Sequence, residues 1–157
     1  MADPQESKRQ QIIESVMTDL RSIRKADGYW FDVEHDSVTR SDIVDFERIK
    51  SAQMPWISVI PGPESTKSLG NQRDESLWDV HICLFVKAEM DEKRRDMERF
   101  LVDVRRKLMA NPGRSGLAKW ARISALDPPE DDDFGYPQYV TCRVTLSVFY
   151  TFNWSQP

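Results

Sequence analysis

The sequence is poor in the residues from which catalytic centres, metal sites and disulfide frameworks are commonly built. It contains two histidines and two cysteines in 157 residues. Two cysteines without a secretion signal are typical of small buried thiols in a reducing compartment. The six glycines form neither a dinucleotide-binding fingerprint nor a phosphate-binding loop. These shortages argue against a disulfide-stapled mini-protein and against a nucleotide-dependent enzyme.

Long apolar runs and an excess of positive charge are missing as well. No stretch approaches the roughly 18 apolar residues of a membrane span, and the first residues lack the apolar segment of a secretion signal. We therefore expect a soluble protein that folds inside the cell and has no membrane partner. The formal net charge of −4 argues against a free-standing or sequence-specific nucleic-acid binder, because such proteins neutralise phosphates with a basic surface.

The chain does contain enough apolar side chain for a core, since 39% of its residues are hydrophobic and 10% are aromatic. A chain near this length buries about 68–70% of the surface that its unfolded form exposes, so no metal or disulfide staple is needed. The length fits one domain, and we find no internal repeat. We predict a single domain over residues 1–157.

Helical spacing of apolar residues predicts two amphipathic helices. The first begins at Lys8 and ends near residues 26–28, where Gly28 supplies a left-handed stop. The second is capped by Asp91 and ends at residues 111–113. Its polar face mixes basic with acidic residues, so it is typical of a solvated, self-paired face, although its basic residues could also meet phosphate.

Alternation of apolar and polar residues predicts the strands. We expect them at residues 29–33, 56–60, 77–88, 121–125 and 140–152, the last being the clearest. The polar stretches 61–75 and 127–137 are predicted to be long loops. Residues 35–54 leave two interpretations open, because Ser41 could cap a short helix or the chain could continue in an extended conformation.

This order of elements predicts an α+β fold. Its sheet is mainly antiparallel or mixed and has four to five strands, and both helices pack against it. A doubly wound fold fits less well, because strands and helices do not alternate regularly and no glycine-rich turn precedes either helix.

No group of residues in the sequence has the make-up of a catalytic or metal centre. His81 and Cys83 lie on one face of a predicted strand, but Cys83 has apolar neighbours and no helix terminus nearby to stabilise a thiolate. Residues 131–133 are three aspartates without the ligand alternation of a calcium loop, which favours a solvated acidic loop. We therefore predict no catalytic residue, no metal and no cofactor, and an interaction or assembly role in place of an enzymatic one.

The order of elements resembles the tail terminator, or tail completion, proteins of long-tailed bacteriophages, of the minor tail protein U type. The resemblance covers residues 8 to 153 approximately. It is carried by Leu20-Arg21-Ser22-Ile23 running into Gly28-Tyr29-Trp30, by Pro55 to Ile60 followed by Gly62-Pro63-Glu64, by the strand 78–86, by the helix 97–108 ending at Asn111-Pro112, and by the strand 144–152.

The resemblance implies a structural virion protein that forms a homo-oligomer, a hexameric ring on the end of the tail tube. The ring would stop tube polymerisation and help to join the tail to the head, with the tube protein and a head-tail connector or neck protein as partners. It implies a place in the virion tail, assembly in the host cytoplasm, no enzymatic activity and no cofactor. The extended loop at 127–137 departs from the shorter family pattern.

Polar residues on the two expected loops are the candidate assembly contacts, because charge complementarity sets the choice of partner. Trp154 joins them, since it lies beyond the last predicted strand among polar residues. The candidates are Glu64, Lys67, Arg73, Asp131, Asp132 and Trp154. Two alternatives stay open at this point: another head-tail connector or neck protein, and a small cytosolic ligand-binding or enzyme-accessory domain with a pocket between sheet and helices.

Overall fold

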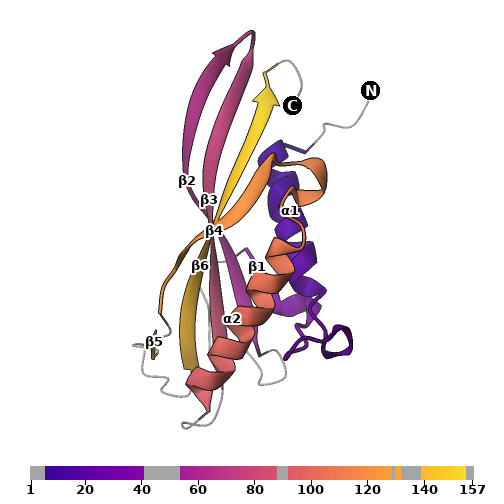
Figure 1. Ribbon diagram of the computed structural model, residues 1–157, viewed down its shortest axis with the longest axis vertical. Helices are drawn as coiled ribbons and strands as arrows, with labels where there is room; N and C mark the ends of the chain where they lie inside the picture. Colours follow the sequence, from indigo (N-terminus) through magenta and orange to yellow (C-terminus); the bar gives the residue numbers. More distant parts are fainter. Residues whose placement is uncertain (1–5, 41–53, 88–91, 129, 132–138, 155–157) are drawn as a thin grey trace.

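The fold is α+β, as predicted (Figure 1). A computed structural model describes residues 6–40, 54–87, 92–128, 130–131 and 139–154. Their helices and strands, in chain order, are α1 (Lys8–Arg21), η1 (Lys25–Asp27), η2 (His35–Ser37), β1 (Val38–Thr39), β2 (Trp56–Gly70), β3 (Arg73–Lys87), α2 (Lys93–Met109), η4 (Arg114–Gly116), β4 (Trp120–Leu126), β5 (Glu130–Asp131) and β6 (Tyr139–Asn153). That the chain forms a single domain stays a prediction.

One mixed sheet organises these elements. Its strand order is β1-β2-β3-β6-β4, and the two-residue β5 pairs with β6. Only the β1–β2 pair is parallel among the described strands, so the sheet is mainly antiparallel. β3 and β6 pair along their whole lengths, from Arg73 opposite Asn153 to Lys87 opposite Tyr139. This long strand pair lies at the centre of the sheet.

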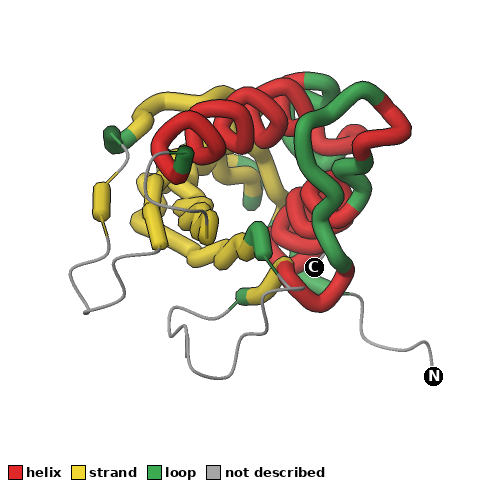
Figure 2. Tube along the Cα trace, turned by 90° about the horizontal axis from the view of Figure 1, so that it is seen from below, coloured by secondary structure: helices red, strands yellow, loops and turns green. Residues whose placement is uncertain are grey.

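Both helices pack on the same face of the curved sheet, which Figure 2 shows in a view along the strands. The predicted apolar stripes are confirmed. α1 buries Ile12, Ile13, Val16, Met17 and Leu20, and α2 buries Met97, Phe100, Leu101, Val104 and Leu108. The matching sheet positions are the alternate residues of β3 from Trp78 to Val86 and of β6 from Val140 to Tyr150, all buried in one cluster. Trp56, in the strand predicted at residues 56–60, is half-buried on the other face.

The first helix is shorter than predicted, and the strand expected at residues 29–33 is wrong. α1 ends at Arg21, and Gly28, with φ of +84°, closes η1 instead. Residues 29–34 belong to no strand. The backbone N–H groups of Trp30 and Phe31 donate to the carboxylate of Asp103 on α2, at 2.9 and 3.0 Å. The Asp103 side chain therefore accepts the hydrogen bonds that these N–H groups would donate to a neighbouring strand. The alternation of exposed and more buried residues over 29–33 agrees with the prediction.

The loop predicted at 61–75 is also wrong. β2 continues to Gly70 and β3 begins at Arg73, so only Asn71 and Gln72 form the turn. Both have positive φ, at 51° and 60°, as the tightest hairpin turns require. The segment lacks apolar alternation because most of it is exposed, and it is held by backbone pairing along β3. The dipeptide Gly70-Asn71 was the sequence signal for this turn.

The second expected loop is described only in part. Glu130–Asp131 pairs with β6, opposite Thr141 and Val140, so this part of residues 127–137 is a short strand. Residues 129 and 132–138 lie outside the described ranges, and so do the expected cap Asp91 and the segment after Ser41. The short strand predicted at 121–125 is confirmed as part of β4.

Candidate assembly surface

A hairpin arm projects beyond the ends of both helices (Figure 1). We define the arm as residues 64–78, the outer half of the β2–β3 hairpin, which β6 extends on one side. Its surface is polar: Lys67 lies opposite Glu75, and the hydroxyls of Thr66 and Ser76 are 3.1 Å apart. Arg73 and Lys67 share the sheet face that the helices leave uncovered. The arm is thus an ordered polar projection.

The root of the arm is fixed by close packing at Gly62. The β2–β3 register shifts between Pro61 and Glu64. A Cβ atom at Gly62 would lie 2.7 Å from the carbonyl oxygen of Asp79 and 2.8 Å from Nε2 of His81, closer than side chains tolerate. The indole N–H of Trp78 donates to the Gly62 carbonyl at 3.2 Å. Glycine therefore lets β2 cross close to β3 where the arm begins.

Glu64, predicted as an assembly contact, is engaged inside the molecule. Its carboxylate accepts a hydrogen bond from the Tyr150 hydroxyl and forms an ion pair with Arg9 at 3.5 Å. The Arg9 guanidinium lies over the ring of Trp78, 4.4 Å from its centroid. Burial, and then the hydrogen bond to Glu64, raises the pKa of Tyr150 well above its ordinary value. This group ties the arm to the first turns of α1.

An aromatic patch on the helix-free face of the sheet was missed by sequence reasoning. Trp120 of β4 stacks on Phe149 of β6 with ring centroids 5.4 Å apart, and the neighbouring Leu77 is 41% exposed. Lys119 lies over Phe149 and forms an ion pair with Glu75 of the arm at 3.7 Å. The patch joins residues from three strands, so its members are not adjacent in the sequence.

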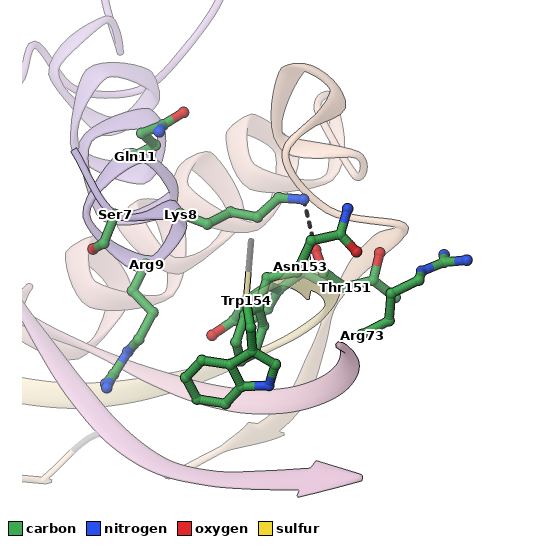
Figure 3. A pocket seen from close by; sticks show the side chains of 10 residues that line it. Ser7, Lys8, Arg9, Gln11, Arg73, Thr151, Asn153 and Trp154 are labelled. Atoms are coloured by element: carbon green, nitrogen blue, oxygen red, sulfur yellow. Dashed lines mark hydrogen bonds between the residues drawn. The ribbon is translucent and has the colours of Figure 1, made fainter. Parts of the chain in front are cut away.

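A cavity of about 520 Å³ lies where the start of α1 meets the end of β6 (Figure 3). Lys8 reaches across it and donates from Nζ to the Thr151 carbonyl at 2.7 Å. Arg9 lines one side and Arg73 the other, with the Trp154 ring between them. Phe152 packs edge-on against Trp154, centroids 5.2 Å apart. The cavity is therefore basic and aromatic.

The structure brings together some of the predicted contact residues and separates others. Arg73 and Trp154 line the same cavity. Trp154 is 68% exposed, yet its indole donates to Asp74 at 3.0 Å. Asp131 lies at the opposite end of β6, and Asp132 is outside the described residues. Whether any of these residues makes an assembly contact stays a prediction.

The helix-free face also carries the two residues considered as a nucleophile and base. Nδ1 of His81 lies 3.2 Å from the Thr145 hydroxyl, and Cys83 is opposite Arg143. Burial raises the pKa of Cys83, so its thiol is protonated at neutral pH and a poor nucleophile. Within the ranges that the structure describes, no group of three or more His, Cys, Asp or Glu residues could hold a metal ion. No helix there is both long and apolar enough to cross a membrane.

The family model of the bacteriophage tail tube terminator protein matches residues 3–113. The chain belongs to this family. The match covers α1, the hairpin with its arm, and α2, while β4, β5 and β6 lie beyond it. No curated protein matches the chain. Membership makes the protein a structural component of the phage tail that associates with the tail tube. The family also points away from an enzymatic role.

Proposed function

We propose that the protein forms a ring on the end of the tail tube, stops the addition of tube subunits and helps to join the tail to the head. The observation that carries this proposal is the match to the tail tube terminator family over the segment that builds both helices and the arm. The ring is proposed to be a homohexamer assembled in the host cytoplasm, with the tube protein on one side and a connector or neck protein on the other.

The arm is proposed as the part that meets the tube. It is long, ordered by strand pairing, and presents Lys67 and Arg73 on an exposed polar surface. A rigid polar projection of this kind suits a specific contact between preformed surfaces, because little conformational entropy is lost on docking. Charge complementarity would then select the tube end over other surfaces.

Reversing the charge of the arm tests this assignment. We expect Lys67→Glu combined with Arg73→Glu to leave the fold intact and to weaken docking to tubes, and wild-type docking to decline as salt rises. The measurement mixes purified protein with assembling tubes and records tube length and end occupancy by electron microscopy. A matched control is Lys25→Glu with Arg105→Glu, which makes the same charge change at exposed positions away from the arm.

The wild-type protein supplies the decisive result. Capped tubes of limited length support a terminator. Tubes that grow equally long with and without the protein, and whose ends stay bare, would show that the proposed function is wrong. Equal docking by the arm variant and the control would instead show that the tube contact lies on a surface other than the arm.

A further inference from the structure

The lining of the cavity at one end of β6 is basic, and the sequence that precedes its other end is acidic. At the Asn153 end is the basic, aromatic cavity, and at the Tyr139 end the chain carries the acidic sequence Glu130-Asp-Asp-Asp-Phe-Gly-Tyr-Pro137. We propose that this acidic segment of one copy docks into the cavity of the next copy. The proposal rests on the proposed function, because it assigns the contact that joins neighbouring subunits of the ring.

The cavity is built to receive an anionic chain. Its lining includes the cations Lys8, Arg9 and Arg73 and no carboxylate. Lys8 uses one donor on the Thr151 carbonyl, and an ammonium group has three. Two nearby carboxylates are already engaged, Glu64 by Tyr150 and Arg9 and Asp74 by Trp154, while Glu6, which precedes the lining residue Ser7, is exposed. The positive charge of the cavity is therefore only partly neutralised from within the chain.

The helix start strengthens this preference. α1 begins at Lys8 with no acidic residue in its first turn, so the positive end of its dipole faces no carboxylate of its own first turn. Trp154 and Phe152 add an aromatic wall. A segment with four carboxylates followed by a phenylalanine and a tyrosine matches both features of the cavity, its charge and its aromatic lining.

The segment cannot reach the cavity of its own chain. The described residues on either side of 132–138 are held at the far end of β6, since Asp131 is paired with Val140 and Tyr139 with Lys87 of β3. From Val140 to Asn153 the strand spans about 40 Å. Seven residues join Asp131 to Tyr139, and a chain of this length fixed at those two positions can reach at most about 14 Å from them. The cavity must therefore take the segment of another copy.

Such a contact is head-to-tail, because each copy offers a cavity at one end and an acidic segment at the other. Contacts of this kind close into a ring when the rotation between neighbours allows it. In a closed ring, the cavity of every subunit would hold the acidic segment of one neighbour, and its own acidic segment would lie in the cavity of the other neighbour. This is the interface type that a terminator ring requires.

A peptide experiment tests the contact without requiring a ring. A fluorescently labelled synthetic peptide of residues 127–138 is titrated into the full-length protein and followed by anisotropy. We expect saturable binding that weakens as salt rises, and that weakens about tenfold when Asn replaces Asp at 131, 132 and 133. Lys8→Glu and Trp154→Ala should each weaken binding about fivefold or more. Lys67→Glu is the matched control, since it makes the same charge change on the arm outside the cavity, and should leave binding unchanged.

A charge swap gives the sharpest result. The protein with Lys8→Glu should bind a peptide with Lys at 131, 132 and 133 more tightly than the wild-type peptide, the reverse of the preference of the wild-type protein. Circular dichroism confirms that each variant is folded. Absence of wild-type binding, or equal weakening by Lys8→Glu and Lys67→Glu, overturns the proposal.

The tube assay separates this proposal from the proposed function. Wild-type protein that caps tubes but does not bind the peptide would be a terminator whose subunits join elsewhere. Peptide binding with the expected pattern, together with uncapped tubes, would leave the contact standing and overturn the terminator function.

Discussion

Arg114 connects the ends of both helices through contacts with a residue of each, Asp19 and Leu108. Its side chain is fully buried between the ends of α1 and α2. It pairs with Asp19 at 2.7 Å and donates to the Leu108 and Asn111 carbonyls at 2.8 and 2.7 Å. Burial lowers the pKa of Arg114 and the neighbouring Asp19 opposes that shift. Nothing in the sequence marks this residue, because Asp19 and Arg114 are 95 positions apart.

The second cysteine gives a prediction at the same scale. Burial raises the pKa of Cys142 to about 11, from 9.0. The folded state thus keeps a proton that the unfolded state loses above pH 9, so the stability tied to it falls as pH rises from 9 through 11. We expect the free energy of unfolding to drop over this range, with up to about 2 kcal/mol of the drop due to Cys142.

The measurement is urea unfolding at several pH values from 8 to 11, for the wild type and for Cys142→Val. Valine keeps an apolar side chain in the site and removes the proton. The variant should show a shallower alkaline loss. Cys83 and Tyr150, whose pKa values are also raised, still contribute in both proteins. Parallel curves for the two proteins would contradict the assignment to Cys142.

At the scale of elements, the sequence predicts best where one face of an element is buried. α2 and β6 follow their apolar periods closely, since the buried apolar residues of α2 form one stripe and those of β6 from Val140 to Tyr150 form one alternating row. The arm and residues 29–34 were misread because their backbone hydrogen bonds depend on distant partners. β3 and β6 hold the arm, and Asp103 holds the N–H groups of Trp30 and Phe31. Periodicity carries no information about such partners.

Shortening the arm tests its role as an element. Deleting residues 67–75 and joining Thr66 to Ser76 through Asn-Gly keeps that strand pair next to the new turn, removes mostly exposed residues and leaves Tyr150 opposite Ser76. We expect the free energy of unfolding to fall by less than about 2 kcal/mol, because little apolar surface is lost. Capping of tubes should be abolished in the electron-microscopy assay. A shortened protein that still caps tubes would contradict the proposed tube contact, and one that fails to fold would show that the arm supports the core.

At the scale of the whole molecule, the sequence did not predict how the candidate contact residues are arranged. Arg73 was expected on a loop and Trp154 beyond the last strand, yet they line one cavity. Lys8 and Arg9 were not among the candidates, although they complete that cavity from α1. These residues come together because β6 ends beside the start of α1. No local sequence pattern predicts that arrangement. Glu64 was expected to face a partner, and its hydrogen bond with Tyr150 could not be predicted from the sequence either.

The overall charge distribution leads to a final prediction, on when the ring forms. Free copies repel one another weakly, since each carries a formal net charge of −4, while the contact proposed between their opposite ends would attract them. A tube end would hold several copies side by side, which raises their effective concentration and favours closure without any new contact. We therefore expect the free protein to be monomeric at low micromolar concentration and to form rings on tube ends. Native mass measurements should give one 18.3 kDa chain without tubes, and negative-stain images should show sixfold rings on tube ends at the same concentration. Stable rings at nanomolar concentration without tubes would contradict templated closure, and rings on tube ends with a different symmetry would contradict the proposed hexamer.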